Sequence, residues 1–144
     1  MSTLETLQST LGAEHAAVWA FGTMGAQTSQ SGQPGLYALM TTGYTIHRSR
    51  RDQLIRAVRD LGVEPVASDV GYELPNDLST TAKLAAAALQ IETRCAVVYA
   101  DLVANTYGDQ RRWAIAALTD TAVRELGFRG SPETFPGMPE LADR

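Results

Sequence analysis

The sequence is poor in the residues that build disulfides and metal sites: it has one cysteine, Cys95, and two histidines, His15 and His47. A single thiol excludes an intramolecular disulfide and a zinc site made of several cysteines. Two imidazoles exclude a metal site built mainly from histidine. Cys95 lies on an apolar face among alanines and valines, a pattern typical of an inert core thiol.

The chain also has no long apolar run. Its longest weakly polar stretch, residues 84–91, is far too short to span a bilayer. The first residues lack the basic and apolar regions of a signal peptide. We therefore expect a soluble, cytoplasmic protein with no membrane partner.

Motifs of common enzyme and nucleotide-binding classes are missing. The sequence has no glycine-rich phosphate loop, no nucleophile elbow and no H-E-x-x-H zinc motif, because the Glu14-His15 pair lacks a second histidine at the required spacing. The net charge of −4 gives no electrostatic footprint for nucleic acid. We expect no nucleic-acid partner.

What is present is a globular composition, with 44% hydrophobic and 19% charged residues in a chain of 144 residues. This length suits one domain that spans residues 1–144. Apolar residues recur in alternating steps of three and four, which predicts helices, and no convincing strand pattern occurs. The predicted helices cover about residues 3–27, 35–61, 81–105 and 109–127.

Loop lengths predict how these helices are connected. Short turns join the first helix to the second and the third to the fourth, so each pair forms an antiparallel hairpin. The connection from Gly62 to Thr80 is long enough to travel the length of a bundle and make the second and third helices parallel. We expect an all-α four-helix bundle, two hairpins joined by one long crossover, with an irregular tail that drapes over it after Gly130.

Each predicted helix carries an ionisable residue near the middle of its core-facing stripe: Glu14, His47, Glu92 and Asp120. If the hairpins are in register, these side chains converge on one layer. Burying three carboxylates is costly unless a metal ion, shared protons or nearby cations neutralise them. The predicted buried polar cluster also includes Tyr44, Arg51 and Tyr99.

Four segments carry a family resemblance: EHAAVWAFG at 14–22, YTIHRSRRD at 44–52, YADLVA at 99–104 and FPGMP at 135–139. They resemble an uncharacterised family of ferritin-like domains, over nearly the whole chain. The resemblance implies a ferritin-like four-helix bundle with no established activity. Dimetal members of the wider superfamily supply a glutamate from the first and third helices and a Glu-x-x-His motif from the second and fourth.

Carried over by position, the resemblance implies a degenerate dimetal site. His47 matches the histidine of the second helix, but Tyr44 stands where that motif needs glutamate. In the fourth helix Asp120 takes the carboxylate position with a shorter side chain, and Val123 replaces the histidine. The two lone glutamates are matched by Glu14 and Glu92.

Two interpretations follow. In the first, which we favour, the dimetal chemistry is lost and Arg51 and His47 replace the metal charge. The domain is then a non-enzymatic bundle that is structural or binds a small ligand or a partner. In the second, a single iron, manganese or zinc ion is bound, with Tyr44 or Tyr99 nearby for redox work. The candidate metal ligands are Glu14, His47, Glu92 and Asp120.

The first helix is apolar on more than one face, because Trp19 and Ala16 lie beside the core-facing Phe21. A helix of this kind usually has a second packing partner. The crossover, the tail or another subunit could cover it, and we expect a homodimer.

Overall fold

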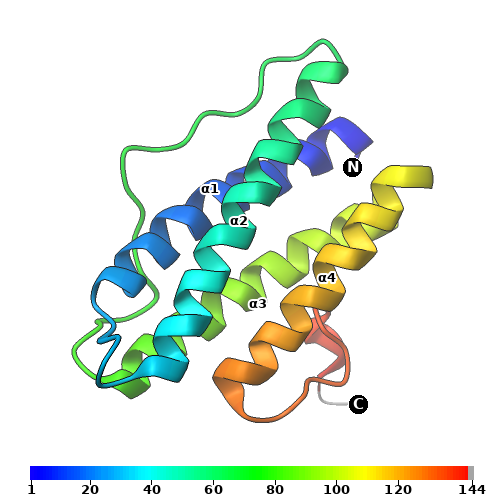
Figure 1. Ribbon diagram of the computed structural model, residues 1–144. Helices are drawn as coiled ribbons and strands as arrows, with labels where there is room; N and C mark the ends of the chain where they lie inside the picture. Colours follow the sequence, from blue (N-terminus) through cyan, green and yellow to red (C-terminus); the bar gives the residue numbers. More distant parts are fainter. Residues whose placement is uncertain (143–144) are drawn as a thin grey trace.

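The computed structural model describes residues 1–142, which form four long α-helices and a short 3-10 helix (Figure 1). No strand occurs in this part of the chain, so the predicted all-α class is confirmed. Each long helix begins and ends within about two residues of the predicted bounds. The elements are α1 (Thr3–Ala26), α2 (Pro34–Asp60), α3 (Thr81–Asn105), α4 (Gly108–Arg129) and η1 (Pro139–Leu141).

The helix ends follow local capping chemistry. α1 begins in a capping box, in which Ser2 Oγ accepts a hydrogen bond from Glu5 N–H and the Glu5 carboxylate accepts one from Ser2 N–H. α4 ends at Gly130, whose φ of 85° favours glycine. α4 begins at Gly108 after Tyr107, and the acidic side chain of Asp109 lies in its first turn, where it interacts favourably with the positive end of the helix dipole.

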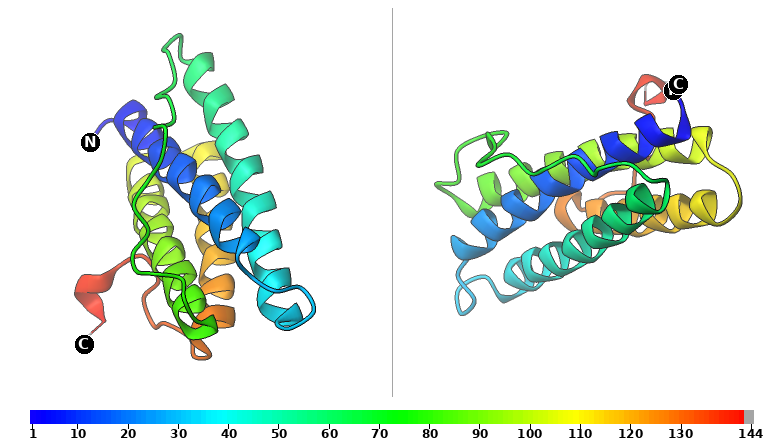
Figure 2. Two further views of the ribbon diagram at one scale, coloured as in Figure 1. Left: turned by 90° about the vertical axis from the view of Figure 1, so that its left-hand side faces the viewer. Right: turned by 90° about the horizontal axis from the view of Figure 1, so that it is seen from above.

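The helices form two antiparallel hairpins, α1–α2 and α3–α4, as the loop lengths predict (Figure 1). α1 packs against both α2 and α3, and α3 packs against α4, whereas α2 and α4 approach each other at few positions. The crossover, residues 61–80, descends from the end of α2 past α1 to the start of α3 (Figure 2). None of the helices within residues 1–142 is both long and apolar enough to cross a membrane.

The crossover is fastened to the outer face of α1. Gln8 Oε1 accepts a hydrogen bond from Val66 N–H at 2.8 Å, and His15 Nε2 donates to the Val66 carbonyl at 2.9 Å. Further along, the ring of Trp19 lies 6.1 Å from that of Tyr72. The crossover therefore supplies the second packing partner of the first helix, and the homodimer stays a prediction without support from this face.

Two apolar clusters fill the bundle. In the larger one, Phe21 of α1 lies against Gly43 of α2, where a Cβ atom would stand only 2.7 Å from the ring. The smaller cluster lies toward the end of the bundle at which α1 starts and α2 ends, and its buried members are Leu7, Leu11, Leu54, Val58, Leu102 and Ala114. Buried polar side chains, among them Glu14, His47 and Glu92, lie between the same helices.

The C-terminal tail packs on α3, which confirms that it covers part of the bundle. Gly137 has a φ of 77°, and a Cβ atom at this position would lie 2.5 Å from the carbonyl oxygen of Ala96. Only glycine allows this approach of the tail backbone to the helix.

Candidate functional site

The site centres on His47, a fully buried side chain of α2. Its Nδ1 lies 2.6 Å from Glu14 Oε2, and its Nε2 lies 3.1 Å from Glu92 Oε1. Burial alone lowers the pKa of His47, but the two carboxylates outweigh it and raise the pKa to about 9. His47 is therefore an imidazolium at neutral pH and donates from both ring nitrogens.

Glu92 receives a second cation from α4. Arg124 Nε donates to Glu92 Oε1 at 2.5 Å, and the same guanidinium donates to Asp120 Oδ2 at 2.8 Å. Burial raises the pKa of Glu92, but His47 and Arg124 overcome it and hold the pKa at about 2. Glu92 is thus ionised under all physiological conditions.

Arg50 of α2 completes the arrangement on the other side. Its guanidinium donates to Asp120 Oδ2 at 2.5 Å and to the Tyr99 hydroxyl at 3.0 Å. The hydroxyl of Tyr99 in turn donates to Glu14 Oε1. Burial and the Glu14 charge raise the pKa of Tyr99 well above its ordinary value, so the phenol stays protonated and can make this hydrogen bond.

These contacts close a circuit that we call the polar ring, and all four long helices contribute to it. Three carboxylates and three cations balance its formal charge, which offsets the cost of burying all of these charges except that of the half-exposed Asp120. In order, its members are Glu14, His47, Glu92, Arg124, Asp120, Arg50 and Tyr99.

Two residues predicted for the buried cluster lie outside the ring. Arg51 is partly exposed and pairs with the adjacent Asp52 at 2.8 Å. Tyr44 packs its ring near Gly22, with the Arg48 guanidinium 5.4 Å from the ring centroid. Both assignments are corrected: each residue lies one position from the core-facing stripe.

The fourth helix is rotated by one position from the prediction. Val123, placed on the core-facing stripe, is 65% exposed, and the buried side chain there is Arg124. Asp120 does reach the ring, but its side chain is 43% exposed. Because one residue turns a helix by about 100°, a register error of one position moves a side chain from the core-facing side to the flank of the helix.

Sequence reasoning missed both ring arginines, Arg50 and Arg124. Arg50 follows His47 by three residues and precedes Leu54 by four, a spacing that fits the core-facing stripe as well as Arg51 does. Arg124 lies one helical turn after Asp120, the spacing of an intrahelical ion pair. The spacing of both arginines was thus visible in the sequence. It could not identify them as buried, because a charged residue in a helix usually faces solvent.

The polar ring does not fit a metal centre. Both nitrogens of His47 are engaged by carboxylate oxygens, and two guanidinium groups stand where a cation would lie. Within residues 1–142, no group of three or more histidine, cysteine or acidic side chains is placed to hold a metal ion. The nearby Cys95 thiol is buried, and burial raises its pKa well above the ordinary value, so it stays protonated.

Comparison with known proteins places the chain in a family. The crystal structure of a conserved hypothetical protein, rv2844, from Mycobacterium tuberculosis is similar, with a TM-score of 0.82 and 29% sequence identity over 89% of this chain and 95% of that chain. No curated protein matches the chain. A family model described as a domain of unknown function, DUF4439, matches residues 6–140. The protein therefore belongs to the DUF4439 family.

Proposed function

We propose that this domain is a non-catalytic ferritin-like bundle, in which side-chain cations have replaced the metal charge and whose role is to bind a ligand or partner or to serve as a structural module. One observation carries the proposal: the polar ring is closed and charge-balanced. Each of its acidic groups already has a cationic or phenolic partner. A site arranged in this way has no open position for the water or substrate that a catalytic metal needs.

The ferritin-like kinship is part of this proposal. The bundle has its long connection between the second and third helices, as ferritin-like bundles do. The buried acids Glu14 and Glu92 come from the first and third helices, the positions at which dimetal proteins carry lone glutamates. His47 likewise comes from the second helix.

Metal analysis tests the proposal. The protein is purified without chelator from cells grown with added iron, manganese and zinc, and bound metal is measured by mass spectrometry. We expect substoichiometric metal that is unchanged in His47→Ala. His15→Ala is the matched control, because His15 is the other histidine and lies outside the ring. A stoichiometric ion that is lost in His47→Ala and retained in His15→Ala overturns the proposal.

A second candidate function is a single-ion site for iron, manganese or zinc at Glu14, His47, Glu92 and Asp120. The observation in its favour is Glu92 Oε2, a buried carboxylate oxygen without a hydrogen-bond partner among residues 1–142. An ion bound there would have to displace the Arg124 guanidinium from Glu92. The same metal analysis decides between the two candidates.

A further inference from the structure

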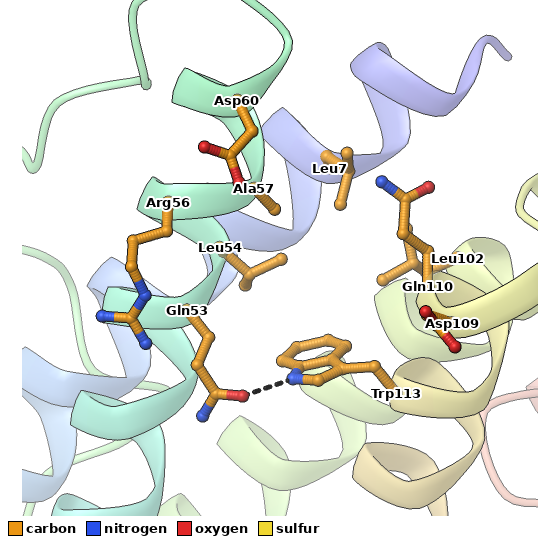
Figure 3. Close-up of a pocket in the computed structure, with 10 residues that line it drawn as sticks. All are labelled: Leu7, Gln53, Leu54, Arg56, Ala57, Asp60, Leu102, Asp109, Gln110 and Trp113. Carbon is orange, nitrogen blue, oxygen red and sulfur yellow. Dashed lines mark hydrogen bonds between the residues drawn. The ribbon is translucent and has the colours of Figure 1, made fainter.

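A cavity of about 320 Å³ opens where α2 and α4 diverge (Figure 3). All four long helices line it, at the end of the bundle where α1 and α4 begin and α2 and α3 end. Cavities of this size, with apolar walls and few polar groups, are typical of small-molecule sites. No residue of the polar ring lines it, so it is separate from the site described above.

The floor of the cavity is the smaller apolar cluster. Leu7, Leu54 and Leu102 face the cavity, although each is no more than 2% exposed. Their side chains carry no polar atoms, so water in the cavity lacks hydrogen-bond partners on this side. Replacing that water with an apolar group is favourable, by roughly 25 cal/mol for each Å² of apolar surface covered.

One wall is Trp113, and it is held rigidly. Its Nε1–H donates to Gln53 Oε1 at 2.8 Å (Figure 3). The Gln53 amide nitrogen in turn donates to Ser49. The indole also lies edge-on to Tyr99, with 6.2 Å between ring centroids. With its N–H engaged, Trp113 offers a ligand only the apolar surface of its ring, and this preorganised wall lowers the entropy cost of binding.

The rim of the cavity is polar and nearly neutral. Asp109 is already paired with Arg112 on the surface. The other rim charges, Arg56 and Asp60, are opposite in sign and stand one turn apart on α2. A ligand with a net charge would therefore gain little from the rim, and it would lose hydration on entering an apolar floor.

We propose that this cavity binds an uncharged amphipathic small molecule. An aromatic or branched aliphatic body lies against Trp113 and the three leucines, and a hydrogen-bonding head meets the rim. The inference extends the proposed function by naming a ligand class. It does not depend on the absence of a metal, because the cavity and the polar ring share no residue.

Fluorescence tests this inference with N-phenylnaphthylamine, a neutral aromatic probe. The Trp19→Phe variant leaves Trp113 as the single tryptophan. Binding in the cavity brings the probe against that indole, so we expect Trp113 emission to be quenched as probe emission rises. Anilinonaphthalene sulfonate, which has the same rings and an added sulfonate, is expected to bind at least about tenfold more weakly.

Two variants locate the binding. Ala57→Leu fills the cavity from α2, and Ala86→Leu adds the same side chain at an exposed position of α3. We expect at least about a tenfold loss of affinity in Ala57→Leu and none in Ala86→Leu. Equal affinity in the two variants, or no binding of the neutral probe, overturns the inference.

A measurement on the unaltered chain keeps the test decisive if Ala57→Leu does not fold. Methyl NMR follows Leu7, Leu54 and Leu102 during titration with the probe. Shifts concentrated on these methyls support the inference, and shifts spread over other leucines contradict it. Metal content, measured separately, reports on the proposed function alone, so the two can fail independently.

Discussion

His47 joins the two acidic sides of the polar ring, because it is the cation between Glu14 and Glu92. Its charge has a direct effect on stability. The pKa of His47 rises from 6.5 to about 9 on folding. The folded state therefore holds this proton more tightly than the unfolded state does.

The raised pKa of His47 makes the folded state less stable as the pH rises. The contribution of His47 is fully present below pH 6.5 and is lost as the pH rises through 9. We expect the free energy of unfolding of the wild type to fall by on the order of 3 kcal/mol across this interval. Urea denaturation at several pH values measures it. His47→Gln cannot titrate, so an equally steep fall between pH 7 and pH 9 in this variant would contradict the prediction.

At the acid end the dependence has the opposite sign. The lowered pKa of Glu92 gives stability that is present above pH 4.5 and lost as the pH falls through about 2. Protonated Glu92 would leave Arg124 and His47 facing each other without the intervening negative charge. This contribution is separate from the loss above pH 6.5, since the two intervals do not overlap.

The identity of the ring residues marks the limit of sequence reasoning at this scale. Glu14 and Glu92 could be placed inward because apolar neighbours one turn away on each side fix their face. His47 could be placed inward because it lies two turns from both Met40 and Leu54 on the same stripe. Arg50 and Arg51 are chemically identical neighbours, and both fit the spacing. The positions of Tyr99 and Asp120 on other helices decide between them.

At the scale of elements, the pairing of α1 and α2 depends on close contact at Gly43. A Cβ atom there would stand 2.7 Å from the Phe21 ring, which also stacks on His47 with 5.2 Å between centroids. Phe21 has little room to move, because it is fully buried. The two helices are thus held at a separation that suits glycine.

We predict that Gly43→Ala destabilises the protein by about 1–3 kcal/mol through overpacking. The matched control is Gly12→Ala, also in a helix, where nothing lies within 4 Å of an added Cβ atom. Because alanine favours helix more than glycine does, this variant should be more stable by about 0.4–1 kcal/mol. Thermal unfolding followed by circular dichroism compares them, and a stabilising Gly43→Ala would contradict the packing argument.

The junction of α4 with the tail contains a second acidic group of interest. Glu125 lies 2.9 Å from Arg129, and Glu133 of the tail lies 3.8 Å from the same guanidinium. Burial, together with the facing Glu133 carboxylate, outweighs Arg129 and raises the pKa of Glu125 to about 7. Two carboxyl groups thus share one cation where the tail leaves the helix.

This junction predicts weakening of the fold with rising pH. The stability associated with protonated Glu125 is fully present below pH 4.5 and is lost as the pH rises through 7. The Glu125→Gln side chain is neutral at every pH. Above pH 7 we therefore expect the free energy of unfolding of this variant to exceed that of the wild type by about 1 kcal/mol, a modest gain because solvent around Glu133 screens the repulsion. Urea denaturation below pH 4.5 and above pH 7 measures the difference between variant and wild type. Glu140→Gln, at an exposed position of η1, is the control. Equal stabilisation by both substitutions would refute it.

At the scale of the whole molecule, much of the architecture could be predicted from the sequence. Helix bounds followed from apolar spacing. Local end signals agree with them in the structure, because the Thr80 side chain accepts from Lys83 N–H and Gly62 has a φ of 75°. The order of short, long and short connections then specified two hairpins and a crossover. These are local or nearly local properties of the chain.

The rotation of the fourth helix could not be predicted in the same way. Its inward face carries Thr121, Arg124 and Glu125, while Ile115 and Val123 face outward. Apolar periodicity is therefore a poor guide there, because polar partners on other helices stabilise the inward side chains. The one-turn spacing of Asp120 and Arg124 fits an ion pair on either face of α4, and only the contact of Arg124 with Glu92 on α3 places it inward.

The closed form of the polar ring also bears on how this family can diverge. Deleting one charge opens the ring and leaves each neighbour with one partner fewer. Removing one member of a buried ion pair costs about 3–5 kcal/mol, whereas exchanging a whole buried ion cluster for apolar side chains is often neutral. Gradual drift at Glu14, Arg50 or Arg124 is thus penalised at every intermediate step, while concerted exchange is not. Homologous lineages should retain the complete set or have abandoned it altogether.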